Sequence, residues 1–234
     1  MIVKNESDVI ARCLRSVASH INSWCIVDTG SVDGTQEIIQ GELNGLPGAL
    51  HERPWSDDFA KARNEALDLA LKHQAPSHLM FIDADEELEA LGKIPLSGWD
   101  ALLIPVEHCG QPGDRFWMIR ADYAGRWVGA RHEDMQPSGR IAKLADSRII
   151  SHTDGARAKD ASTAQGDLRA LLMAVQADPS VSRNWHYLGM TFAQVGDFAQ
   201  AEKAFSVRAQ MDGDPREIEI TQAFLNQLQG ATQC

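Results

Sequence analysis

The strongest constraint on the fold is an alternation of short apolar segments with helical repeats over the first 83 residues. The chain opens with "IVK", and "DVIARCLRSVASHI" then places apolar residues at helical spacing, at positions 9, 10, 14, 17 and 21. Ser7 or Asp8 is expected to cap this helix. Trp24–Val27 is typical of a second strand, and a second helix is expected to open between Asp33 and Thr35. This order predicts strands joined by crossover helices.

The alternation continues through "GALHERP", a periodic helix in "DDFAKARNEALDLALKHQ" and the apolar segment "SHLMFID". Such a sequence predicts a parallel, doubly wound sheet, in which ligands bind beyond the carboxyl ends of the strands. Asp28 and Asp83 both fall at such ends. We therefore expect a functional site at that edge of the sheet.

The segment "FIDADEELEA", from Phe81 to Ala90, ends an apolar strand in five acidic side chains within seven positions. Like charges this close repel each other by about 1 kcal/mol per pair in water, and by more in the interior. A divalent cation would offset this repulsion, and Asp83 and Asp85 lie on the same side of an extended segment. Surface loops also carry D-x-D pairs, so the motif alone leaves a solvated loop open.

From Ile94 to His152 the pattern changes to short apolar pieces separated by Gly and Pro, which is typical of mixed or antiparallel strands. These pieces are "DALLIPV", "RFWMIR", "GRWVGA" and "SRIISH". The polar segment "TDGARAKDAS" then marks a boundary, beyond which the sequence is helical. We expect an α/β domain over residues 1–160 and a small all-α region over residues 161–234.

The helical part contains "NWHYLGMTFAQVGDFAQAEKAF", followed by Pro215. The spacing of its aromatic, leucine and small residues matches one tetratricopeptide repeat of about 34 residues. The matching positions are Trp185, Leu188, Gly189, Phe192, Ala201 and Phe205. Gly189 and Ala201 let two helices approach closely. A single repeat cannot bury its core alone, so flanking helices over residues 165–177 and 216–229 are expected to cover it.

The formal net charge of −11 provides no basic stripe for a nucleic acid. The sequence has no apolar run of the roughly 18 residues that a membrane helix needs and no signal-peptide pattern, so a cytoplasmic protein is expected. Cys13, Cys25, Cys109 and Cys234 are widely spaced, and this indicates neither a zinc site nor a disulfide framework.

Three further polar segments each have a purely structural interpretation. "VDTGSVDGT" can form a capped turn, with Gly30 and Gly34 in backbone conformations that other residues avoid. "HED", at residues 132–134, can be a solvated loop, and His152 can be a histidine at the end of a strand. None of these segments identifies a function by itself.

Taken together and in order, the segments resemble the family 2 glycosyltransferases of the GT-A fold, in the branch with tetratricopeptide helices behind the catalytic domain. The segments are "MIVKNE", "VDTGSVDGT", "WSDDFAKARNEAL", "FIDADEEL", "WVGARHE", "IISH" and the repeat, over nearly the whole chain. The resemblance implies a GT-A domain over 1–160 and tetratricopeptide-like helices over 161–234. It also implies transfer of a sugar from a nucleotide diphosphate sugar, most often a UDP-sugar, with inversion at the anomeric carbon.

The resemblance also implies roles for individual residues. The residues expected around the nucleotide sugar are Val3, Asn5, Glu6, Asp28, Thr29, Arg63, Asn64, Asp83 and Ala84. Asp85 matches the direct ligand of Mn²⁺ or Mg²⁺, with Asp83 and His152 as further metal ligands. Glu133 matches the carboxylate near the acceptor, and Asp134 is the alternative. A general base must not be tied up on the metal, which favours this loop over Asp83 and Asp85.

The chain departs from the family at two positions. Members usually carry a few residues ahead of "IVKNE", so a shortened first strand is expected, and Thr29 stands where related loops often have a second aspartate.

Two other functions stay open, a non-catalytic interaction protein that uses its repeat helices and a nucleotidyltransferase, although "KNESDV" is not the Gly-rich basic loop of the latter. The expected partners are a nucleotide-sugar donor, a glycan or protein acceptor, and a protein or a second copy at the repeat helices.

Overall fold

The computed structural model describes the chain except residues 73–75, 96, 109, 137, 161 and 232–234, and for residues 228–231 it describes the backbone only. Two cysteines, Cys109 and Cys234, therefore lie outside the described residues. The chain forms two compact units. The first comprises Met1–Ser56, Lys61–Trp127 and Met135–Asp160, and the second comprises Asp57–Ala60, Val128–Asp134 and the chain beyond Asp160.

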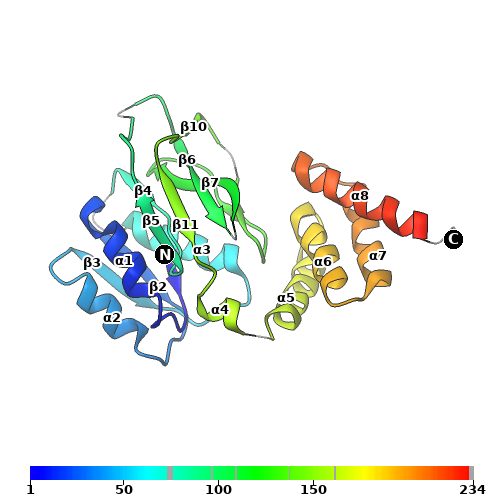
Figure 1. Cartoon of the computed structure of the whole chain (residues 1–234), viewed down its shortest axis with the longest axis horizontal. Coiled ribbons are helices and arrows are strands. Elements are labelled where there is room, and N and C mark those ends of the chain that lie inside the picture. Colours follow the sequence, from blue (N-terminus) through cyan, green and yellow to red (C-terminus); the bar gives the residue numbers. More distant parts are fainter. Residues whose placement is uncertain (73–75, 96, 109, 137, 161, 232–234) are drawn as a thin grey trace. The chain divides into compact units, whose positions relative to one another are not determined.

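The first unit begins with a parallel sheet in the order β1 (Ile2–Val3), β2 (Trp24–Asp28) and β3 (Gly48–Glu52). Helix α1 (Ile10–Val17), the 3₁₀ turn η1 (Ala18–His20) and helix α2 (Thr35–Glu42) connect these strands, and the two helices lie beside the sheet (Figure 1). The periodic apolar residues of α1 serve two cores. Ile10 and Leu14 pack with β1, β2 and α2, and Cys13 and Val17 pack with the second sheet.

Helix α1 begins without the side-chain cap that the sequence predicts from Ser7 or Asp8. The backbone N–H groups of Val9 and Ile10 donate to the Glu6 carbonyl instead, at 3.0 and 2.9 Å. Asp8 pairs with Lys159, so its carboxylate is used elsewhere. The capping prediction is therefore wrong, because the turn after β1 is closed by its own backbone.

The second sheet has the order β4-β7-β6-β11-β5, and β10 (Ile141–Lys143) pairs with β6. Its strands are β4 (His78–Met80), β5 (Glu86–Ala90), β6 (Ala101–His108), β7 (Gln111–Arg120) and β11 (Arg148–Ser151). Three of the pairings along this order are antiparallel and β6·β11 is parallel, which confirms the expected mixed sheet.

Helix α3 (Phe59–Lys72) leads to β4, where the predicted parallel alternation fails. Strand β4 pairs antiparallel with β7, with Leu79 opposite Ile119. The segment after β4 follows the same edge, since the Phe81 N–H donates to the Trp117 carbonyl at 2.7 Å. The buried Trp117 and Ile119 make β7 a long apolar edge for β4 to join.

The remaining elements of the chain's middle part are short. They are β8 (Trp127–Val128) and β9 (Asp134–Met135), which pair with each other, and α4 (Ala156–Lys159). The fold is the expected mixed α/β architecture with helices at its C-terminal end. Among the described residues, none of the helices combines the length and the apolar character needed to span a bilayer.

The second unit is built on α5 (Thr163–Ala177), α6 (Ser182–Gln194), α7 (Phe198–Arg208) and α8 (Pro215–Ala231). Leu188 of α6 packs with Leu171, Val175 and Ala204, and these side chains form the core of the unit. Of the predicted repeat aromatics, Phe205 is fully buried, whereas Trp185 is only partly buried because it lies at the edge of this cluster.

Gly189 of α6 lies in close contact with Phe205 of α7. A Cβ atom there would lie 2.7 Å from the buried ring of Phe205. We expect Gly189→Ala to lower the free energy of unfolding by about 1 to 3 kcal/mol, because this overpacking outweighs the helix propensity of alanine. Urea unfolding measures the change. Gly166→Ala in α5 is the matched control, since nothing lies within 4 Å of its Cβ, and it should stabilise by about 0.5 to 1 kcal/mol. Equal effects of the two variants would contradict the close approach.

Candidate active site

The loops that follow β1 and β2 are joined by hydrogen bonds at the carboxyl ends of these strands. Asn5 adopts a positive φ of 56°, and its side-chain oxygen accepts from the Val32 N–H at 2.9 Å. The Asn5 N–H donates to the Ser31 hydroxyl, and the Glu6 N–H donates to the Thr35 hydroxyl, both at 2.8 Å. The two loops therefore form one rim at the edge where the strand order predicts a ligand.

Hydrogen bonds of Asp28 and Thr29 stabilise this rim. The carboxylate of Asp28 accepts from the N–H groups of Gly30 and Ser31, at 2.8 and 2.9 Å, and Gly30 has the positive φ of 111° that the sequence predicts. Although burial opposes ionisation, hydrogen bonds from Ser31 and Gly30 lower the pKa of Asp28. The N–H and hydroxyl of Thr29 both donate to the carbonyl of Val3, so this side chain joins β2 to β1.

The acidic segment carries its charge on a turn and on β5. Asp83 pairs with Arg63 at 2.8 Å and with Arg115 at 3.3 Å, and Arg115 also pairs with the buried Glu86. Because β5 alternates, Glu87 and Glu89 lie on its other face. Glu87 contacts the His152 ring at 3.0 Å, and Glu89 pairs with Arg148. Four of the five carboxylates thus have a basic partner.

Asp85 is the exception, because no basic side chain in the described part of the chain pairs with its carboxylate. Burial and the nearby charge of Asp83 raise its pKa. Glu6 is close by, since a Cβ on Gly155 would lie 3.0 Å from a Glu6 carboxylate oxygen and 3.3 Å from the Asp85 Cβ. Burial, and next Asp85 among the neighbouring charges, raise the pKa of Glu6 to about 7, although the Ala156 N–H donates to its carboxylate. The pair brings two carboxyl groups close together, and the charges of Arg115 and Lys159 only partly offset their repulsion.

Helix α3 supplies Arg63 and Asn64. The Arg63 guanidinium bridges to Asp83 and lies 5.0 Å from the ring centre of Trp127. Burial alone would raise the pKa of Asp83. The charges of Arg63 and Arg115 outweigh this effect, so the pKa is lowered and the carboxylate stays ionised. The side-chain amide of Asn64 donates to the Trp127 carbonyl at 2.9 Å and accepts its N–H at 3.0 Å. Asn64 therefore fixes the segment that follows β7.

The structure brings Asp83, Asp85 and His152 into one region of the first unit without forming a ready metal cage. The His152 N–H donates to the Asp85 carbonyl at 3.1 Å, while its ring contacts Glu87. Within the described ranges, no three His, Cys, Asp or Glu side chains are grouped so that they could hold a metal ion. The metal set stays a prediction, and Asp85 is its member with unused ligand capacity. Ala84 is buried beneath the turn between these acids.

Glu133 and Asp134, the two candidate bases, belong to the second unit, as does the short segment Asp57–Ala60 at the start of α3. His132, which precedes them, has a positive φ of 51°, an unusual conformation for a residue with a side chain. No sequence pattern indicates that this loop packs with the helices, because His132, Glu133 and Asp134 are polar and aperiodic.

Sequence reasoning also missed Arg115, which neutralises two acids at once. Arg115 stands on β7, and the pairing of β4 with β7, continued by the hydrogen bond from the Phe81 N–H to the Trp117 carbonyl, brings it to the acidic turn. A single sequence does not specify that register. The alternation of "EELEA", with Glu86 and Leu88 buried, is the signal that could have identified the strand.

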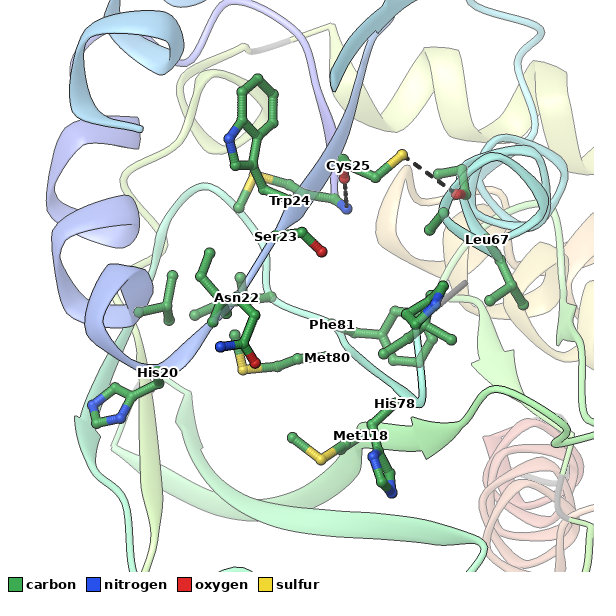
Figure 2. Close-up of a pocket in the computed structure, with 18 of the residues that line it drawn as sticks. His20, Asn22, Ser23, Trp24, Cys25, Leu67, His78, Met80, Phe81 and Met118 are labelled. Carbon is green, nitrogen blue, oxygen red and sulfur yellow. Dashed lines mark hydrogen bonds between the residues drawn. The ribbon is translucent and has the colours of Figure 1, made fainter. Parts of the chain in front are cut away.

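A cavity of about 580 Å³ lies in the first unit, and none of these acids lines it. Figure 2 shows the side chains of Trp24, Cys25, Met80 and Met118 around it. It is largely apolar and lies at the amino end of β2, and Arg63 is its only lining residue among those predicted for the site. The cavity therefore does not replace the rim at the carboxyl ends as the candidate site.

The comparisons with known proteins concern the family and the fold. Residues 1–92 match the model of Glycosyl transferase family 2. The crystal structure of S. aureus TarS aligns over 95% of this chain and 52% of its own, with a TM-score of 0.52 and 14% identity. This likeness concerns the fold, which is the GT-A-like glycosyltransferase fold.

Two relatives match part of the chain. A TPR repeat-containing protein of Synechococcus elongatus is 39% identical over 88 residues, which cover 38% of this chain and 20% of the relative. The SPbeta prophage-derived glycosyltransferase SunS of Bacillus subtilis is 34% identical over 96 residues, 40% of this chain and 21% of SunS. The chain thus spans about a fifth of the length of these relatives. The family match supports the expected resemblance to family 2 glycosyltransferases over residues 1–92.

Proposed function

We propose that the chain is a metal-dependent, inverting glycosyltransferase that moves a sugar from a nucleotide diphosphate sugar, most simply a UDP-sugar, to an acceptor hydroxyl. The observation that carries this proposal is the charge balance of the acidic segment. Asp85 is the one carboxylate of that segment without a close basic or imidazole partner among the described residues, and it lies beside Glu6. A cation that arrives with the donor would supply the missing charge.

The donor would lie on the rim formed by the loops after β1 and β2. Val3, Asn5, Glu6, Asp28 and Thr29 would shape the pocket for base and ribose, and the hydrogen bonds between the loops support a rigid rim. Arg63 and Arg115 are already paired with Asp83, so they would act on the diphosphate through the field of that cluster. Asn64 would act by fixing Trp127. Ala84 has a small side chain and would act by leaving room at the acidic turn.

The residues at the acidic turn fit Mn²⁺ or Mg²⁺ in their chemistry, because both ions prefer oxygen ligands and commonly share phosphate oxygens with a substrate. Asp85 would be the direct ligand, with Asp83 and His152 as the further predicted ligands. The ion would supply positive charge where negative charge develops on the departing diphosphate. The ion pairs of Asp83 and the contact of His152 with Glu87 would have to loosen for these residues to join.

Glu133 is proposed as the general base, with Asp134 as the alternative. The base removes the proton of the acceptor hydroxyl as its oxygen attacks the anomeric carbon, the bond to the diphosphate breaks, and the diphosphate leaves with its electron pair. The acceptor, a glycan or a protein, stays unspecified by these residues. A partner at the repeat helices stays a prediction.

Calorimetric titration of the chain with UDP, with and without Mn²⁺, tests the proposal. We expect UDP binding that strengthens when Mn²⁺ is present, and slow Mn²⁺-dependent hydrolysis of one member of a panel of nucleotide sugars. Metal-dependent binding without hydrolysis or transfer would favour the non-catalytic interaction protein. Absence of nucleotide binding would refute the donor site.

A further inference from the structure

The loop Val128–Asp134, here called the base loop, makes several contacts with the helices of the second unit. Within this loop, Ala130 donates its N–H to the side-chain oxygen of Asn184 at 3.0 Å. Asn184 is in the first turn of α6 and only 5% exposed. This hydrogen bond stabilises the loop conformation, because breaking it would leave a buried N–H group without a partner.

Two neighbours of Asn184 hold the next part of the base loop. The Nε of Arg183 donates to the His132 carbonyl at 2.7 Å. The ring of His132 stacks on that of Tyr187, with centres 4.3 Å apart and planes 19° from parallel. These contacts stabilise the positive φ of His132, which directly precedes Glu133. The direction in which the chain leaves His132 is therefore fixed by α6.

A third contact ties the base loop to α5 and to the start of α3. Arg131 is 3% exposed, and its Nε donates to Asp167 at 2.7 Å. Its Nη1 donates to the Asp57 carbonyl at 2.6 Å, and the Phe59 N–H donates to the Ala130 carbonyl at 3.0 Å. Phe59 begins α3, the helix that carries Arg63.

We propose that the helical unit positions the general base of the reaction. Asn184, Arg183 and Asp167 are positioning residues that hold the base loop in the one conformation from which its carboxylate acts. This inference rests on the proposed function, since it assigns the base to that loop. It gives the helices a role in the chemical step, in addition to any partner they bind.

The test uses Asn184→Ala, with Asn184→Asp as the conservative variant, because aspartate keeps an oxygen that can accept the Ala130 N–H. Hydrogen exchange of the base-loop amides is measured first. We expect Asn184→Ala to speed exchange at Ala130 and its neighbours, and Asn184→Asp to restore much of the protection. Met190→Ala is the matched control, because Met190 lies on the same helix and is 40% exposed; it should change neither exchange nor turnover.

The second measurement is kinetic. Asn184→Ala should lower kcat by about 10- to 100-fold, the loss expected when a catalytic group is displaced by about 1 Å. The KM for the donor and the affinity for UDP should stay within about twofold. Combined with Glu133→Gln, the Asn184→Ala change should cause little further loss, because both act through one carboxylate.

Different results separate the failures. Unchanged loop exchange in Asn184→Ala would overturn the positioning role. A fall in UDP affinity that parallels the fall in kcat, with a lowered Tm, would show a merely structural role and overturn it as well. If the losses of Asn184→Ala and Glu133→Gln multiply fully in the double variant, Asn184 does not act through Glu133. The same double-variant comparison with Asp134→Asn then decides whether Asn184 acts through Asp134. A wild-type chain that binds UDP but transfers no sugar would refute the proposed function, while the exchange data would still decide how the loop is held.

Discussion

Glu133→Gln should lower turnover by about 10² to 10⁴-fold while donor and metal affinity stay unchanged. The amide is close in size to the carboxylate but cannot accept the acceptor proton, and loss of a general base has this usual range. Initial rates with saturating donor, together with calorimetric titration of UDP, measure the two quantities separately.

Glu202→Gln is the matched control for this change, because Glu202 is an exposed glutamate of the same unit. It should leave turnover unchanged. Near-normal turnover in Glu133→Gln together with an inactive Asp134→Asn would transfer the role to Asp134. If both variants stay active, the base is not on this loop.

Asp85→Asn is expected to remove the metal-dependent part of UDP binding. The neutral amide is a weak ligand for Mn²⁺, so the gain in UDP affinity on adding Mn²⁺ should fall by more than about 100-fold, beyond the loss caused by removing an outer partner of a ligand. Glu89→Gln, on the same acidic segment but paired with Arg148, should retain the full gain. Equal metal-dependent gains in wild type and Asp85→Asn would remove Asp85 from the site.

The same variant should not destabilise the metal-free protein. Burial and Asp83 raise the pKa of Asp85 above its ordinary value. The ionised form is therefore disfavoured in the folded state, and stability falls as the pH rises through this raised pKa. Asp85→Asn lacks this titration, so its Tm without metal should equal or exceed that of wild type above this pH. A lower Tm would mean that Asp85 has a stabilising partner.

The sequence predicted the elements of the first unit well and their pairing less well. Periodicity identified α1 and α3, because an amphipathic helix records its own buried face in its spacing, and helix-start residues identified α2. Strand β4 was also found, but its antiparallel pairing with β7 was not. Pairing depends on which edge is available in space, and Leu79 carries no information about Ile119.

The candidate site shows the same division. The carboxylates of the acidic segment were recognised from their crowding, and the repulsion was assigned to a metal alone. In the structure Arg63 and Arg115 neutralise Asp83, and Arg115 reaches it from a strand more than 30 positions later. Long-range partners of this kind leave no local pattern. The sequence therefore indicated that the acidic segment needs positive charge nearby, but not that two arginines supply part of it.

The division of the chain between its two units has a consequence for how such a protein can be recombined. Residues 57–60 and 128–134 belong to the helical second unit, although in the sequence they lie between segments of the first unit. A crossover near residue 160 that grafted helices from another protein would leave Ala130 and Arg131 facing foreign side chains at positions 184 and 167. Functional exchange of the helices would therefore need matching replacements in both short segments, so these three stretches are expected to be inherited as one block.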